Sequence, residues 1–356
     1  MRAFRDRVRA ALLGSRLGTV RVARVGLAAT GLVGAFVAPS LLESRFTVKI
    51  LTFTAIDLVV VTGLALLFGY AGQISLGHAG FFGLGAYTSA ILTTTYGAPW
   101  IVGMACGTLV AALGGLLLAI PSLRLRGHYL AMATLGFGEI ARVAFVQLRS
   151  VTGGPDGFHG IPPASFAGLT IETPQADFTF AWVVAVLAMF LVSNLGEMRP
   201  GRALKAMHGS ELGAKACGVD VSRMKITVFT ISAGMAGLAG VLYAHAVGFI
   251  SPSTFTLNLS IVLLAMVVLG GPGSLSGAAA ATVVLSLLPF LDALIPGIPR
   301  DVAAALQDWQ HDIYGAVIIL VMLFMPKGLA GAGRAAARKL RAMADQRAAS
   351  SEVESA

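Results

Sequence analysis

Residues 48–68 read VKILTFTAIDLVVVTGLALLF, a run in which Lys49 and Asp57 are the only charged residues. A helix needs about 20 mostly apolar residues to cross the hydrocarbon core of a membrane. The run is continuous and lacks the alternation of apolar and polar residues that is typical of a half-buried strand. Because only α-helices and closed barrels satisfy their backbone polar groups in hydrocarbon, this run predicts a membrane-spanning helix.

The rest of the chain has the same character. Of 356 residues, 56% are hydrophobic and only 12% are charged, and the mean hydropathy is +0.81. Soluble domains are about 25% charged, so the composition excludes a soluble enzyme. We predict an all-α, polytopic transmembrane bundle of about ten spans. The candidate spans are residues 25–42, 48–68, 81–96, 100–120, 129–148, 180–195, 226–250, 259–270, 275–291 and 313–325.

Three of these runs, 81–96, 259–270 and 313–325, are short, so we expect them to be broken, re-entrant or extended by polar neighbours. The first run has the opposite feature, because 18 apolar residues follow 24 residues that carry seven Arg. The apolar stretch of a signal peptide has about 7–15 residues. We therefore expect an uncleaved first span.

Basic residues are distributed unevenly among the loops. With ten spans, 21 of the 26 Lys and Arg fall on one side, four fall on the other, and Arg142 lies inside a span. Cytoplasmic loops carry the excess of Lys and Arg, so both termini are expected in the cytoplasm. The net charge of +9 then reports topology and not a nucleic-acid partner. We divide the chain into a basic N-terminal segment (1–24), a permease domain (25–327) and a basic tail expected to be disordered (328–356).

Charged residues inside spans are rare because each is costly there. Glu139 and Arg142 are three residues apart on one predicted helix, so they share a face and can pair. The pair is either structural or a polar patch on a transport path. Asp57 has no partner nearby in the sequence, which leaves a proton-relay role open.

Glycines and polar residues interrupt the apolar sequence at residues 69–80 and again at residues 269–277. Irregular backbone at membrane depth is tolerated only inside protein or beside water, and transporters place binding sites or gates in such segments. Candidate path or gate residues are Gln73, Ser75, His78 and Gly80. His78 is alternatively a hydrogen-bonded structural histidine. The small residues Gly103, Gly107, Gly234, Ala236, Gly237 and Gly240 are expected at close helix contacts.

The loop 196–225 predicts a short helix over Glu211–Cys217, with Ser210 as its N-cap and Gly218 just past its end. Such a helix suits insertion into a groove of another protein, although a solvated loop helix is the alternative. No phosphate-binding loop of the Gly-x-x-x-x-Gly-Lys-Ser/Thr type occurs. Active transport would need an ion gradient or a separate ATPase.

Several motifs in this chain resemble those of branched-chain amino acid ABC permeases of the LivM type. They cover about residues 50–327 in the order found in that family. The motifs are 72–87 (GQISLGHAGFFGLGAY), 125–135 (LRGHYLAMATL), 152–157 (TGGPDG), 201–203 (GRA), 211–218 (ELGAKACG) and 251–274 from Ser-Pro to VLGGPGS.

The resemblance implies an ABC importer permease fold and one of two membrane subunits, paired with a sister permease. Two cytoplasmic ATPases and a periplasmic solute-binding protein would complete an inner-membrane complex. Glu211, Ala214 and Gly218, with Arg202 nearby, would form the ATPase-docking loop, and residues 73–80 would border the path. ATP would bind to the partner subunit, so no cofactor, metal site or catalytic residue is expected in this chain.

The resemblance leaves the solute open, because permeases for urea, short amides and aromatic acids look similar to those for branched-chain amino acids. A gradient-driven secondary transporter is the second mechanism, motivated by Asp57 and the Glu139–Arg142 pair. A membrane-embedded enzyme is rejected, because the histidines are scattered over both sides of the predicted topology. The external loop 149–178 is either a docking surface or an ordered turn.

Overall fold

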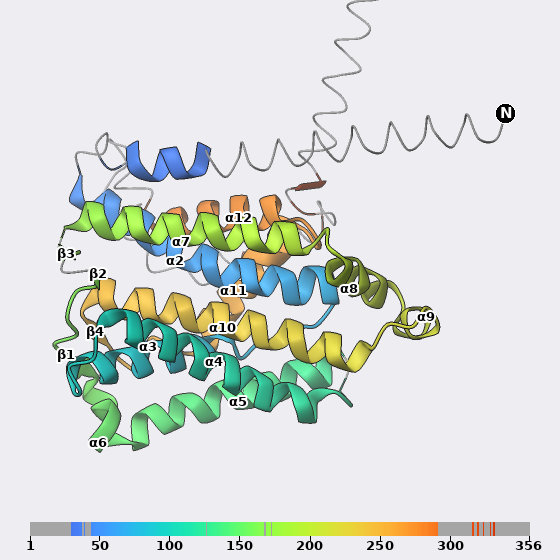
Figure 1. Ribbon diagram of the computed structural model, residues 1–356, viewed down its shortest axis with the longest axis horizontal. Coiled ribbons are helices and arrows are strands. Elements are labelled where there is room, and N and C mark those ends of the chain that lie inside the picture. The colour runs from blue at the N-terminus through green and yellow to red at the C-terminus, as the bar shows by residue number, and fades with distance from the viewer. Residues whose placement is uncertain are drawn as a thin grey trace, which may run out of the picture.

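The computed structural model describes residues 44–290, with gaps at 126, 167–168 and 172, and some residues outside that range. The latter are 30–37, 39, 315, 316, 319, 323, 328, 330 and 331. Most of the first and last expected spans, the N-terminal segment 1–24 and most of the tail 328–356 lie outside the described residues. The all-α prediction is confirmed for the described part, which is a bundle of long helices (Figure 1).

The long elements follow the apolar runs of the sequence closely. They are α2 (Arg45–Leu64) continued by the π-helical turn η1 (Ala65–Tyr70), α3 (His78–Thr94), α4 (Trp100–Ser122), α5 (His128–Gln147), α7 (Pro174–Leu195), α10 (Val221–Val247), α11 (Leu257–Gly270) and α12 (Leu275–Leu287).

Five of these elements are long and apolar enough to cross a membrane by length and composition. They are Arg45–Tyr70, α4, α5, α7 and α10. The remaining three, α3, α11 and α12, have 17, 14 and 13 residues. As expected for the short run 81–96, polar neighbours extend it, because α3 begins three residues earlier, at His78.

Short elements gather at the two ends of the bundle. One end, which we call the α8/α9 end, carries α8 (Arg199–Gly209) and α9 (Glu211–Ala216), and it lies at the right of Figure 1. The Lys205 ammonium of α8 lies 4.8 Å from the ring centroid of Tyr70, at the end of η1.

The opposite end holds the connections between α5 and α7 and between α10 and α11. Two antiparallel strand pairs lie there, and Phe158 pairs with Ile250 although they are far apart in the chain. The described residues of the loop 149–178 are therefore ordered, and the use of this loop as a docking surface stays a prediction. Its elements are α6 (Arg149–Thr152), η2 (Gly154–Asp156), β1 (Phe158–His159), β2 (Ser165–Phe166) and β3 (Leu169–Thr170). The strand β4 (Phe249–Ile250) pairs with β1, and η3 (Leu288–Phe290) follows α12.

Helix α10 lies at the centre of the bundle and packs against α2, α3 and α4. Glycine allows this contact because a side chain would not fit. A Cβ added at Gly240 would lie 1.9 Å from the carbonyl oxygen of Phe82, and one at Gly237 would lie 2.2 Å from Ala111 Cβ. The interpretation of these small residues as helix-packing positions is confirmed, in line with the close approach that glycine permits between membrane helices.

Candidate functional site

Helix α9 is defined by local capping. The Ser210 hydroxyl accepts a hydrogen bond from the backbone N–H of Gly213 at 3.1 Å. Gly218 follows the helix with φ of +79°, a left-handed conformation that glycine adopts without strain. The predicted helix is thus present, and it ends at Ala216, one residue earlier than expected.

The orientation of α9 differs from the simplest expectation for a docking helix. The Glu211 carboxylate lies 2.6 Å from the Lys225 ammonium of α10, and the Lys225 side chain is only 10% exposed. Ala214, one turn along α9, is buried. Glu211 and Ala214 therefore face the body of the protein and hold α9 against it.

The outward face of α9 consists of other residues. Leu212 is 79% exposed, the highest value among the large hydrophobic residues of the described chain. Gly213, Lys215 and Ala216 beside it are also exposed. Sequence reasoning missed Leu212, because the inward orientation of Glu211, which leaves Leu212 outside, depends on the contact with Lys225. Gly218 is also exposed.

Arg202 makes a hydrogen bond within the connection between α7 and α8. Its guanidinium Nη1 donates to the backbone oxygen of Glu197 at 2.6 Å. This bond spans the start of α8, where Gly201 approaches the backbone of Leu195. The arrangement assigns Arg202 to the connection between α7 and α8.

The irregular segment 71–77 leads from η1 to α3 through the interior of the protein. Ser75 and His78 are fully buried. The two ring nitrogens of His78 lie 2.9 Å from the Ser75 hydroxyl and 2.8 Å from the Ser232 hydroxyl of α10. The structure thus supports the interpretation of His78 as a hydrogen-bonded histidine at a bend. Most of the irregular backbone lies inside protein, one of the two settings expected for it.

Hydroxyl groups from other helices satisfy the backbone of this segment. The Thr134 hydroxyl of α5 accepts from the N–H of Leu76, and the Ser260 hydroxyl of α11 accepts from the N–H of Ala79, both at 2.9 Å. At Gly80 an added Cβ would lie 3.0 Å from the Cα of Gly138. Gly80 therefore lets α3 approach α5 closely, and the segment joins four helices.

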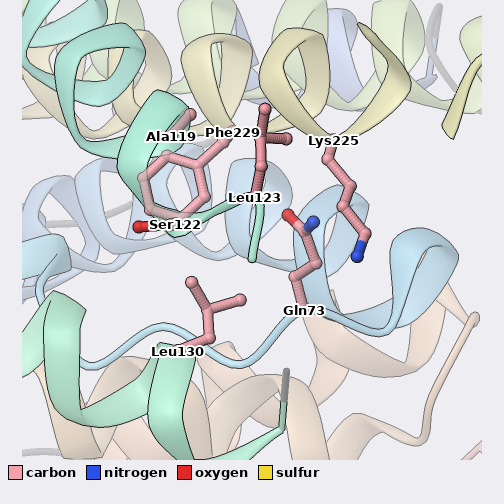
Figure 2. A pocket seen from close by; sticks show the side chains of 7 residues that line it. All are labelled: Gln73, Ala119, Ser122, Leu123, Leu130, Lys225 and Phe229. Atoms are coloured by element: carbon pink, nitrogen blue, oxygen red, sulfur yellow. The ribbon is translucent and has the colours of Figure 1, made fainter. Parts of the chain in front are cut away.

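Gln73 connects this segment with the α8/α9 end. Its side chain is buried, and its carboxamide oxygen makes no hydrogen bond with the described residues. Figure 2 shows Gln73 and Lys225 extending into the same small pocket, which Ser122, Leu123 and Phe229 also line. Since Lys225 is paired with Glu211, the pocket lies directly behind α9.

The three charges inside spans have defined partners. Asp57 of α2 accepts a hydrogen bond from the Ser286 hydroxyl of α12 at 3.3 Å. The Arg142 Nε donates to both carboxylate oxygens of Glu139, at 2.9 and 3.0 Å, and the predicted pair is confirmed. This pair does not lie at a helix contact within the described chain, since the Glu139 and Arg142 side chains are 48% and 33% exposed.

Comparison with known sequences assigns the family. Residues 46–324 match the family described as branched-chain amino acid transport system / permease component. The chain belongs to this permease family. The resemblance seen in the motifs is thereby confirmed, and it extends over nearly the whole described bundle. With its long apolar helices, the chain is a multi-pass membrane permease.

Individual relatives agree with the family. The LivM permease proteins of Escherichia coli K12 and of Salmonella typhimurium LT2, named for high-affinity branched-chain amino acid transport, are each 36% identical over 80% of this chain and 70% of their own length. The LivH permease protein of the Escherichia coli system is 26% identical over 76% of this chain and 90% of its length. No solved structure matches the chain.

Proposed function

We propose that this permease is one membrane subunit of an ABC importer that carries branched-chain amino acids across the inner membrane, driven by ATP that a separate subunit hydrolyses. The observation that carries this proposal is α9, a capped helix that is fixed to α10 by an ion pair and exposes Leu212 outside the bundle. A rigid surface helix with an exposed apolar side chain is the kind of element that inserts into a groove of a partner.

The ion pair gives α9 a mechanical role in this proposal. A motion of the ATPase that displaces α9 would pull on Lys225. The force would therefore reach α10, the central helix of the bundle. The same lysine lines the pocket of Gln73, at the start of the irregular segment. The contacts therefore offer a continuous route from the docking surface to residues 73–80, the segment proposed to border the path.

Orientation follows from charge. The described α8/α9 end carries Arg199, Arg202, Lys205, Lys215 and Arg223, whereas Arg45, Lys49 and Arg149 belong to the opposite end. The side with more Lys and Arg is cytoplasmic in membrane proteins. We infer that α9 faces the cytoplasm, where an ATPase can reach it, and that ten spans place both termini there.

The proposed complex contains further subunits. LivM and LivH carry the name of the same transport system in Escherichia coli, which supports a heterodimer of this chain with a sister permease. Two ATPases would bind ATP, so this chain would need no cofactor, and a periplasmic binding protein would deliver the amino acid. The end that carries β1–β4 is the surface proposed to receive that protein.

Purification of the tagged chain from native membranes in mild detergent tests this assignment. Mass spectrometry of the eluate should identify an ATPase and a second permease. A folded chain that repeatedly elutes alone would contradict the proposal. A captured binding protein could then be screened with leucine, urea, short amides and aromatic acids to decide among the solutes.

A further inference from the structure

The Glu139–Arg142 pair lies in the second half of α5, and Glu139 borders a hollow between α5, the start of α3 and the start of α11. Both residues are well inside the span His128–Gln147, and both side chains are partly exposed. A charged residue at the centre of a membrane helix costs about 2.5–3.5 kcal/mol when it faces hydrocarbon. This face of α5 is therefore covered by water or protein and not by lipid tails.

A hollow of about 190 Å³ opens beside Glu139. Leu135 and Gly138 of α5 form one wall, and the start of α3 forms the second through Leu76 and Ala79. The third wall is the approach to α11, from Phe255 to Ser260. The hollow thus lies where α3 begins inside the protein, which is the position that transporters with interrupted helices use for binding.

The lining has two chemical parts. Leu76, Leu135, Phe255 and Leu257 make most of the surface apolar, and Thr256, Ser260 and Glu139 add polar groups at its border. An apolar cavity of about 150 Å³ holds a benzene molecule, so a hollow of this size admits a branched aliphatic side chain. The adjacent carboxylate and guanidinium carry one charge of each sign, as does an amino acid zwitterion.

We propose that this hollow is a solute subsite on the translocation path, which takes the aliphatic side chain of an α-amino acid while Glu139 faces its ammonium group and Arg142 its carboxylate. The proposal rests on the proposed import function. It adds a location for the path, between α5, the start of α3 and the start of α11, and it names Leu135 and Leu257 as residues that contact the solute.

Cysteine labelling of the complete transporter tests this subsite. The background is C106A/C217S, which removes both native cysteines, and the variants are Leu135→Cys and Leu257→Cys on two walls of the hollow. Leu113→Cys, an exposed position in the middle of α4, is the matched control. The reagent is a charged methanethiosulfonate, which reacts only with thiols that water reaches.

We expect both hollow variants to react at least tenfold faster than Leu113→Cys. Leucine-loaded binding protein with ATP should slow their reaction at least threefold. Reaction of both variants no faster than the control, or rates that leucine does not change, would overturn the subsite. ATP-driven leucine uptake by the wild-type complex is measured separately, so that a failure of the import function is distinguished from a failure of the subsite.

Discussion

The side-chain ammonium of Lys225 lies 2.6 Å from a carboxylate oxygen of Glu211 and fixes the short helix α9 to the central helix α10. Lys225 is almost fully buried, so removing its partner would leave a buried charge unpaired. The contact therefore attaches the surface helix α9 directly to a helix of the transmembrane bundle. It is the feature through which ATP-driven motion of a bound partner would reach the membrane helices.

Reversing the charge of Glu211 is expected to uncouple α9 from the core. Glu211→Lys places two ammonium groups together, and breaking a buried pair costs about 3–5 kcal/mol. We predict a variant that still inserts in the membrane but recovers at least tenfold less ATPase in detergent purification and shows a parallel loss of uptake. The double variant Glu211→Lys/Lys225→Glu restores the pair and should recover most of both. Normal coupling in Glu211→Lys alone would refute this role of the contact.

Leu212 is expected to be the main apolar anchor for the ATPase. A truncated hot-spot side chain costs about 2 kcal/mol or more in binding, which exceeds a tenfold change in affinity. Leu212→Ala should lower ATPase recovery by about tenfold. The thermal unfolding of the permease should stay unchanged. Leu117→Ala on α4, also highly exposed, is the control that should leave ATPase recovery intact. Equal recovery for both variants would argue against Leu212.

The close contact of α3 with α10 is expected to tolerate no side chain at Gly240. A methyl group there would meet the backbone of Phe82, and overpacking of this kind costs about 1–3 kcal/mol. Gly240→Ala should lower the Tm measured in detergent. Gly136→Ala provides the comparison, because an added Cβ at Gly136 meets nothing within 4 Å, so its Tm should stay equal or rise. Equal Tm values would mean that the two helices are not packed as described.

His78 is expected to be a structural residue. His78→Ala removes the partner of the buried Ser75 and Ser232 hydroxyls, and each unsatisfied buried group costs about 1–3 kcal/mol. The Tm should fall clearly, whereas His128→Ala, at the exposed start of α5, should leave it unchanged. A His78→Ala protein of normal Tm that has lost transport would instead support a gate role.

Much of the bundle was predictable from apolar length alone. The runs 48–68, 100–120 and 129–148 each became a helix with ends within a few residues of the prediction, because hydrocarbon leaves the backbone few alternatives. Helix α9 was predictable for a local reason, since its caps lie within the same few residues.

The arrangement of the candidate site was not predictable in the same way. Ser232 and Ser260 lie 154 and 181 residues from the groups that they bind at the start of α3, and only tertiary packing brings them there. The inward orientation of Glu211 depends on Lys225 in the same manner, since the spacing of α9 alone does not decide which face meets α10. Ser286 likewise became the partner of Asp57 through the packing of α2 on α12.

The most direct test of the import function is leucine uptake into proteoliposomes that contain the complete transporter, with binding protein outside and ATP inside. We predict uptake that requires ATP hydrolysis and that a protonophore does not reduce. Uptake that persists without ATP and collapses with the protonophore would contradict the account. It would assign transport to an ion gradient, with Asp57 as the first residue to neutralise.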